Sequence, residues 1–157
     1  MSLKTSVERV RQTLRSMGLR ATVTEFSEST RTAAEAAAAI GTTVGQIAKS
    51  LVLMVGNEPI LVLVSGANRV DMEKMNRRLG KKIIKPDAET VRRVTGFSIG
   101  GVPPVGHSKR LRTIADEDLL NFPVVYAAAG TPNAVFSLSP RDLVRITEAE
   151  VVNLKEG

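Results

Sequence analysis

The sequence of 157 residues contains no cysteine and a single histidine, His107. Without cysteine the chain can form no disulfide bond, thiolate nucleophile, or Cys-based zinc or iron–sulfur site. A lone histidine also argues against other transition-metal clusters, so we expect neither a metal nor a cofactor. Aromatic residues make up only 3% of the chain, which argues against a surface that binds single-stranded nucleic acid by stacking on its bases.

Long hydrophobic runs are also absent. No window approaches the roughly 18 apolar residues of a membrane span, and the first residues, MSLKTSVERVRQTLRSMG, lack the apolar core of a signal peptide. We therefore expect no membrane partner and a cytoplasmic location.

The composition is that of a folded domain, with 43% hydrophobic and 24% charged residues. The length predicts a single domain over residues 1–157. Twenty-two Lys and Arg residues against 16 Asp and Glu residues give a net charge of +6. Nine basic and four acidic residues fall within residues 69–93. This charge favours a polyanionic partner and an ordinary solvated basic face about equally.

Two apolar runs, LVLMV (51–55) and ILVLVS (60–65), flank Gly56-Asn57-Glu58-Pro59 and predict an antiparallel hairpin. Because both faces of each run are apolar, we expect these strands at the centre of a sheet. The other patterns predict helices and strands interspersed irregularly, which favours an α+β or mixed α/β fold over a regular βαβ array. The expected helices cover residues 6–17, 33–40, 44–50, 70–79 and 87–95, with a helical turn near 118 and a short helix from 140. The other expected strands cover residues 21–26, 81–85, 124–129 and 134–138.

Lys49 is the first candidate for chemistry. It lies in IAKSLVLMV, where a predicted helix meets a strand that is apolar on both faces. A charged side chain there costs free energy unless it has a partner. A lysine that ends a helix also has an ordinary role, since a cation stabilises the C-terminal dipole. From the residue alone, this structural role is favoured over a functional one.

The second candidate is the segment FSIGGVPPVGH (97–107), which precedes Lys109, Arg110 and Arg112. Its two adjacent glycines let backbone N–H groups approach a ligand closely, and its two adjacent prolines fix the chain without a hydrogen-bond ladder. The segment therefore predicts either a pocket wall or a surface crossover. His107 could be a general base, although a lone histidine is more often a structural hydrogen-bonding group. The break GTPN (130–133) likewise offers either substrate donors or a turn.

Taken together and in this order, VGQIAKSLVLMV, GGVPPVGH and AAAGTPNAVFSLSPRDL resemble the YbaK and prolyl-tRNA synthetase associated domain family. The resemblance runs from about residue 30 to residue 151. It implies a mixed α/β domain with a curved, mostly antiparallel central sheet flanked by helices. It also implies an aminoacyl-tRNA deacylase that hydrolyses mischarged tRNA in trans, most of all of the tRNA(Pro) type.

The resemblance assigns roles to individual residues. Lys49 matches the family lysine that deacylation requires, and residues 100–104 match the GxxxP loop that borders the aminoacyl pocket. Val135 and Ala128 stand where the Cys-tRNA(Pro) deacylases carry an acidic and a small polar residue, so the resemblance leaves open which amino acid is removed. The implied substrate-binding residues are Ser50, Gly100, Gly101, Val102, Pro103, Pro104, Gly106, His107, Thr131 and Asn133. The implied tRNA-binding surface comprises Arg77, Arg78, Lys109, Arg110 and Arg112.

A sequence without cysteine, metal motif or catalytic triad is compatible with hydrolysis of an activated ester. This reaction requires an attacking water that is positioned and charge that is stabilised, rather than a strong protein nucleophile. We expect Lys49 to engage the terminal phosphate or ribose, and backbone amides of Gly100 and Gly101 to position the ester carbonyl. The expected partners are aminoacyl-tRNA and a prolyl-tRNA synthetase acting in trans. Two alternatives remain at this stage: a non-catalytic module that binds tRNA or a synthetase, and a hydrolase of small activated acyl compounds.

Overall fold

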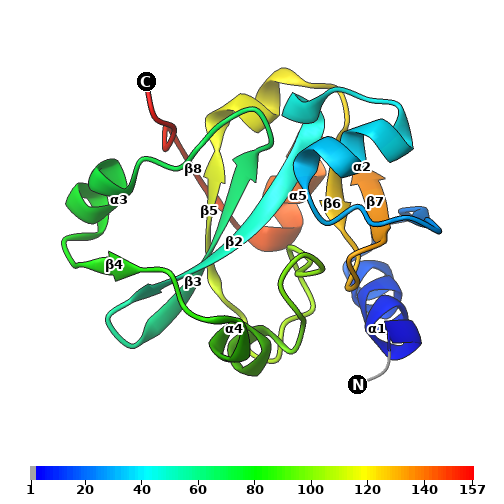
Figure 1. Cartoon of the computed structure of the whole chain (residues 1–157), viewed down its shortest axis with the longest axis horizontal. Coiled ribbons are helices and arrows are strands. Elements are labelled where there is room, and N and C mark those ends of the chain that lie inside the picture. The colour runs from blue at the N-terminus through cyan, green and yellow to red at the C-terminus, as the bar shows by residue number, and fades with distance from the viewer. Residues whose placement is uncertain (1–2) are drawn as a thin grey trace.

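The predicted apolar hairpin forms the centre of an eight-stranded sheet in the computed structural model, which describes residues 3–157 (Figure 1). Strand β2 (Ile47–Val55) pairs antiparallel with β3 (Glu58–Ser65). The strand order is β1-β7-β6-β2-β3-β5-β8, and β4 pairs with β2 off this path. The remaining strands are β1 (Val23–Glu25), β4 (Ile83–Ile84), β5 (Arg112–Asp116), β6 (Val125–Ala128), β7 (Ala134–Leu138) and β8 (Glu150–Val152).

The sheet is mixed, as the fold class requires. The pairs β1–β7, β6–β7, β2–β3 and β2–β4 are antiparallel, and the pairs β2–β6, β3–β5 and β5–β8 are parallel. Antiparallel pairs therefore outnumber parallel ones by only one within the described residues. The parallel neighbours are far apart in sequence because each needs a crossover connection.

The helices begin and end close to the residues that the sequence signals indicate. They are α1 (Leu3–Ser16), α2 (Ala33–Ile40), α3 (Met72–Leu79), α4 (Ala88–Thr95) and α5 (Pro140–Thr147), with 3₁₀ turns η1 (Val44–Gln46) and η2 (Glu117–Asn121). The capping box of Thr32 and Glu35 opens α2. Gly41, Gly80 and Gly96 end three helices in the left-handed conformation that glycine adopts without strain.

The helix expected over residues 44–50 is wrong. Only η1 is helical, and β2 begins at Ile47, which pairs with Tyr126 of β6. The Gln46 side chain accepts from the Thr43 N–H at 3.4 Å, so a helix-capping interaction is present but opens a single turn. Sheet pairing on both sides then overrides local helix propensity. Lys49 consequently lies inside a strand, and the helix-dipole role considered for it does not apply.

Strand β3 is buried on both faces, as its apolar run predicted. Leu61 and Leu63 belong to a core shared with residues of α1, α4 and α5, whereas Val62 and Val64 belong to a core shared with α3. Helix α2 packs its buried alanines, Ala36 and Ala37, against Ile47 at the start of β2. The central strands are therefore held rigidly, and β2 carries the candidate site on a fixed scaffold. Within residues 3–157, no helix is long and apolar enough to cross a membrane.

Candidate active site

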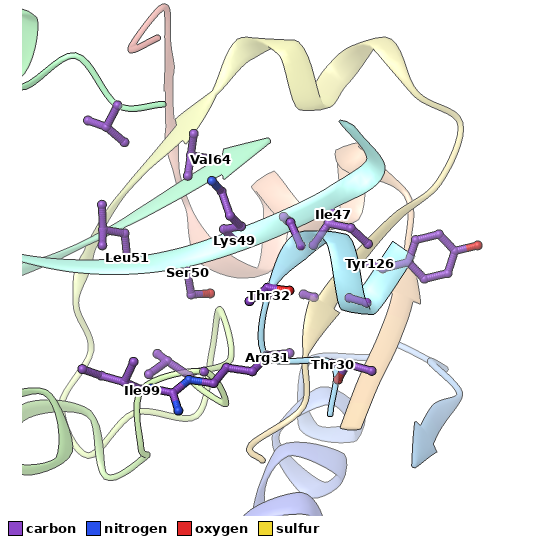
Figure 2. Close-up of a pocket in the computed structure, with 18 of the residues that line it drawn as sticks. Thr30, Arg31, Thr32, Ile47, Lys49, Ser50, Leu51, Val64, Ile99 and Tyr126 are labelled. Carbon is purple, nitrogen blue, oxygen red and sulfur yellow. The ribbon is translucent and has the colours of Figure 1, made fainter. Parts of the chain in front are cut away.

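Among residues 3–157, no strand pairs with the middle of one edge of β2. On that side, β6 pairs with Ile47 and Ala48, and β4 pairs with Met54 and Val55. Residues 49–53 lie between these two partners and border a gap in the sheet. A cavity of about 750 Å³ opens along this gap and is closed on its far side by residues 30–33 and the loop that contains Gly100 (Figure 2).

The open edge of β2 presents backbone groups to the cavity. In an antiparallel pair, alternate residues direct both N–H and C=O toward the partner strand. The Gly66 N–H donates to the Ile47 C=O at 2.8 Å, so the odd-numbered residues of β2 bond to β3. Ser50 and Val52 therefore direct their N–H and C=O groups away from β3 and into the gap. A ligand in the cavity finds backbone donors and acceptors at fixed positions.

Ser50 also supplies an unpartnered hydroxyl. Its Oγ is buried, and among the described residues it is the buried side-chain polar atom that lacks a hydrogen-bond partner. Figure 2 shows the Ser50 side chain leaving β2 toward Arg31 and Thr32, on the opposite side of the strand from Lys49. A buried hydroxyl without a partner costs free energy. The Ser50 hydroxyl is therefore available to form a hydrogen bond with a polar ligand.

Lys49 is held at the cavity by one backbone group. Its Nζ donates to the Asn68 carbonyl oxygen at 3.2 Å, and its side chain is partly buried. Burial lowers the pKa of the Lys49 ammonium, the neighbouring Arg69 lowers it further, and the Asp116 carboxylate opposes both effects. The Lys49 ammonium therefore keeps N–H groups beyond the one that donates to Asn68, and Lys49 is part of the cavity lining.

Cations dominate the charged lining of the cavity. Arg31, Lys49, Arg69 and Lys85 contribute to the lining, with Glu156 as the acidic residue beside them. No ion pair among the described residues involves any of these four cations. The cavity is therefore suited to a ligand that carries negative charge, such as a phosphodiester.

The basic surface predicted from the sequence is largely neutralised by acids. Arg78 and Arg112 both contact Glu150, and Arg110 contacts Glu148 at 2.8 Å. Arg77 and Lys109 are exposed. The structure brings none of these five residues into the cavity lining. Arg69 and Lys85 belong to the basic stretch of residues 69–93 noted in the sequence, although no pattern singled them out from it. Sequence reasoning missed Arg31, because a single cation in a loop carries no local pattern.

The GxxxP loop contributes its first half to the cavity. Gly100 and Val102 line the cavity, and Gly100 has a φ of +92°. A Cβ on Gly100 would lie 2.6 Å from Cγ of Arg31, so the absence of a side chain lets Arg31 cross the loop. The Gly101 N–H donates to the Ser98 C=O at 3.0 Å. The expectation that the Gly101 amide positions a substrate is therefore not supported by its geometry. The Gly100 backbone, in contrast, borders the cavity and is available to a ligand.

The residues from Pro103 to His107 do not line the cavity that contains Lys49. Pro103 and Pro104 are buried, and Gly106 and His107 line a separate hollow with Arg9. The His107 Nε2 bonds the Pro103 carbonyl at 2.6 Å, and burial is the main cause that lowers the pKa of its imidazole. The bond to Pro103 agrees with the structural role that a lone histidine more often has. The structure does not bring His107 together with Lys49.

The segment that contains Thr131 and Asn133 packs against the GxxxP loop. The Thr131 hydroxyl donates to Asn133 Oδ1 at 3.0 Å, and the Asn133 amide donates to the Phe26 carbonyl at 2.8 Å. A Cβ on Gly101 would lie 2.7 Å from the Thr131 backbone, so the two segments are in direct contact. Neither side chain is part of the cavity lining. Val135 and Ala128, the two positions that depart from the Cys-tRNA(Pro) deacylase pattern, both are.

Replacing Gly100 with alanine is expected to displace Arg31 and reduce substrate binding. The matched control is Gly56→Ala, because Gly56 also has a positive φ, of +62°, but a Cβ there would meet nothing within 4 Å. Both variants should lose about 1 kcal/mol of stability from backbone strain. Only Gly100→Ala should raise KM for the substrate, by about tenfold. Equal KM values in steady-state assays of the two variants would contradict this role of Gly100.

Comparisons with known proteins agree with this geometry. A family model described as the aminoacyl-tRNA editing domain matches residues 27–146. The uncharacterized protein YwhH of Bacillus subtilis (strain 168) is 33% identical over 130 residues, which cover 82% of this chain and 83% of that protein. EbsC of Enterococcus faecalis (strain ATCC 700802 / V583), named as a candidate Cys-tRNA(Pro)/Cys-tRNA(Cys) deacylase, is 26% identical over 132 residues, which cover 82% of this chain and 80% of EbsC.

A solved structure is similar over nearly the whole chain. It is described as a candidate trans-editing enzyme for prolyl-tRNA synthetase, and it is 49% identical with a TM-score of 0.94. The match covers 99% of this chain and 100% of that one. The editing-domain match covers β2, the GxxxP loop and the residues that line the cavity apart from Glu156. Together with these likenesses, it shows that the chain belongs to the aminoacyl-tRNA editing domain family.

Proposed function

We propose that this protein is an aminoacyl-tRNA deacylase that hydrolyses the ester of mischarged tRNA in trans, with tRNA(Pro) as the carrier. The observation that carries the proposal is the cavity along the open edge of β2, which combines Lys49, the unpartnered Ser50 hydroxyl and a cationic lining. Family membership supports the deacylase activity. The 49% identical neighbour, described as a candidate trans-editing enzyme for prolyl-tRNA synthetase, supports the choice of tRNA.

In the proposed mechanism, the terminal adenosine enters the gap in the sheet with its phosphate near Arg31, Lys49 and Arg69. The Lys49 ammonium engages the phosphate or the ribose. The N–H groups of Ser50 and Gly100 stabilise the ester carbonyl as negative charge develops on its oxygen. Water attacks the carbonyl carbon, the bond to the ribose oxygen breaks, and that oxygen takes up the proton, which leaves a free amino acid and an intact tRNA.

The apolar part of the lining suits a small side chain. Ala127, Ala128, Val102 and Val135 line the cavity and present no charge to the aminoacyl group. One methylene changes binding by only about 1 to 3 kcal/mol, so a synthetase discriminates poorly between similar side chains. A second cavity that admits the smaller amino acid and excludes the larger cognate one raises the accuracy. We infer that the preferred substrates carry a small, uncharged side chain.

The direct test is hydrolysis of a panel of tRNA(Pro) species charged with alanine, cysteine, serine, threonine or proline. Catalytic amounts of the protein should release at least one of the small amino acids and spare prolyl-tRNA(Pro). The readout is loss of radiolabelled amino acid from acid-precipitated tRNA. Tight binding of the tRNAs without turnover would instead identify a non-catalytic module.

Salt dependence separates the deacylase from a hydrolase of small acyl compounds. If cations of the cavity contact phosphates, KM should rise with salt concentration. For single-stranded RNA, each contact should contribute about 0.7 to the slope of log KM against log salt concentration. Arg69→Ala should lower that slope by about one such contact. Comparable activity on a free amino acid ester, with no salt dependence, would contradict the proposed substrate.

A further inference from the structure

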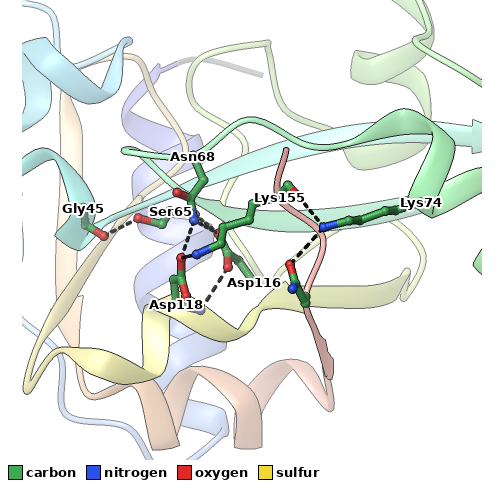
Figure 3. Close-up of polar contacts among 8 residues, drawn as sticks. Gly45, Ser65, Asn68, Lys74, Asp116, Asp118 and Lys155 are labelled. Atoms are coloured by element: carbon green, nitrogen blue, oxygen red, sulfur yellow. Dashed lines mark hydrogen bonds and ion pairs between the residues drawn. The ribbon is translucent and has the colours of Figure 1, made fainter. Parts of the chain in front are cut away.

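A buried carboxylate, that of Asp116, organises the loop between β3 and α3 (Figure 3). Asp116 as a whole residue is 1% exposed, and its Oδ2 accepts from the Ser65 N–H at 3.0 Å and from the Asn68 amide at 2.8 Å. Its Oδ1 accepts from the Asp118 N–H at 2.9 Å. The carboxylate therefore joins the end of β3, the following loop and the start of η2.

Asn68 is fixed at several atoms. Besides its bond to Asp116, its amide nitrogen donates to Asp118 Oδ2 at 2.9 Å, and its backbone N–H donates to the Ser65 C=O at 2.9 Å. Its carbonyl oxygen accepts from Lys49 Nζ at 3.2 Å. Because the side-chain NH₂ and the backbone N–H of Asn68 both donate to fixed acceptors, the position of this carbonyl is set by the surrounding network.

The segment that follows β8 closes the network from the outside. Lys155 Nζ contacts Asp118 Oδ2 at 2.8 Å. The Leu154 C=O accepts from the Asp71 N–H at 2.7 Å, and the Glu156 N–H donates to the Arg69 C=O at 2.9 Å. This segment lies beyond residues 27–146, which the editing-domain model matches.

We propose that Lys155 is a positioning residue for Lys49, acting through Asp118 and Asn68. Lys155 holds the Asp118 carboxylate against the Asn68 amide, and the fixed Asn68 carbonyl holds the Lys49 ammonium at the edge of the cavity. A lysine has a long, flexible side chain, so an anchor is needed to keep its ammonium in one place. The consequence for catalysis rests on the proposed deacylase function.

A positioning role can be separated from a structural one because the outer ion pair is partly exposed. The side chains of Lys155 and Asp118 are 37% and 25% exposed, and ion pairs of this kind contribute little to the stability of a fold. Catalysis is more sensitive, since small displacements of a positioned group lower the rate strongly. Loss of Lys155 should therefore affect activity far more than melting temperature.

The test compares Lys155→Met with Lys155→Arg, which keeps a donor for Asp118. Deacylation of the best tRNA in the panel should fall about 5- to 20-fold in Lys155→Met and return to within about twofold of wild type in Lys155→Arg. Arg141→Met removes an exposed cation of α5 that does not line the cavity, and it should keep wild-type activity. Wild-type activity in Lys155→Met, or an equal loss in Lys155→Arg, would overturn the proposal.

A second measurement tests the positioning without relying on activity. In protein labelled with ¹⁵N-lysine, the Nζ resonance of Lys49, assigned by its loss in Lys49→Ala, should shift or broaden in Lys155→Met and stay in place in Lys155→Arg. An unchanged Lys49 resonance in Lys155→Met would refute the inference. If the wild-type protein hydrolyses no aminoacyl-tRNA, the proposed function fails, and the resonance alone decides whether Lys155 positions Lys49.

Discussion

Replacing Lys49 with alanine is expected to reduce kcat/KM for deacylation by about 100- to 1000-fold, the range found when one charge-stabilising group is removed from an active site. The Lys49 ammonium donates to the Asn68 carbonyl and borders the cavity, so its loss leaves no cation at the middle of β2. The backbone groups of Ser50 and Gly100 remain, which is why some activity should persist. Single-turnover hydrolysis of the aminoacyl-tRNA measures the effect on the chemical step.

The fold should tolerate this change. Lys49 is only partly buried, and its one hydrogen bond is to a carbonyl that water can reach once the side chain is removed. Melting temperatures of Lys49→Ala and of the control Arg141→Ala should lie within about 4 °C of wild type. A melting temperature that falls far below this range would show that Lys49 stabilises the sheet. Activity within a few-fold of wild type would contradict its catalytic role.

The sequence predicted the centre of the fold well because local patterns determine it. Apolar runs on both sides of Gly56 predicted the hairpin of β2 and β3, and the helices expected over residues 33–40, 70–79 and 87–95 end where α2, α3 and α4 end. The start of β2 was predicted wrongly. A capping signal at Thr43 favours a helix, but pairing of Ile47 with β6, nearly 80 residues away in sequence, determines the strand.

The candidate site was predicted only in part, for a related reason. Lys49, Ser50 and Gly100 stand in motifs that can be recognised in the sequence, and the structure brings all three to one cavity. Arg31 and Arg69 reach the same cavity only because the chain folds back on β2 from two directions. The open edge of β2 could not be predicted at all, since it depends on where β6 ends and β4 begins.

The largest effect on stability is expected for Asp116→Ala. The Asp116 carboxylate is buried and accepts three hydrogen bonds, from the Ser65 and Asp118 N–H groups and the Asn68 amide. Alanine would leave these donors without their acceptor at a position that is shielded from solvent. Removing one member of such a buried network costs about 3 to 5 kcal/mol. Urea denaturation should show this loss, and the melting temperature should fall by on the order of 10 °C.

Two further variants decide whether burial of the carboxylate is the cause. Asp116→Asn keeps the volume but places an NH₂ group against one of the donors, so it should also destabilise the protein, by about 2 kcal/mol or more. Asp118→Ala removes the partly exposed neighbour that contacts Lys155, and it should cost no more than about 1 kcal/mol. Similar losses for Asp116→Ala and Asp118→Ala would mean that the ion pair with Lys155, rather than the buried acceptor, holds the loop. A larger loss of stability for Asp116→Ala than for Asp118→Ala would mean that Asp116 stabilises this region of the fold. Asp118 and Lys155 would then serve mainly to position Lys49.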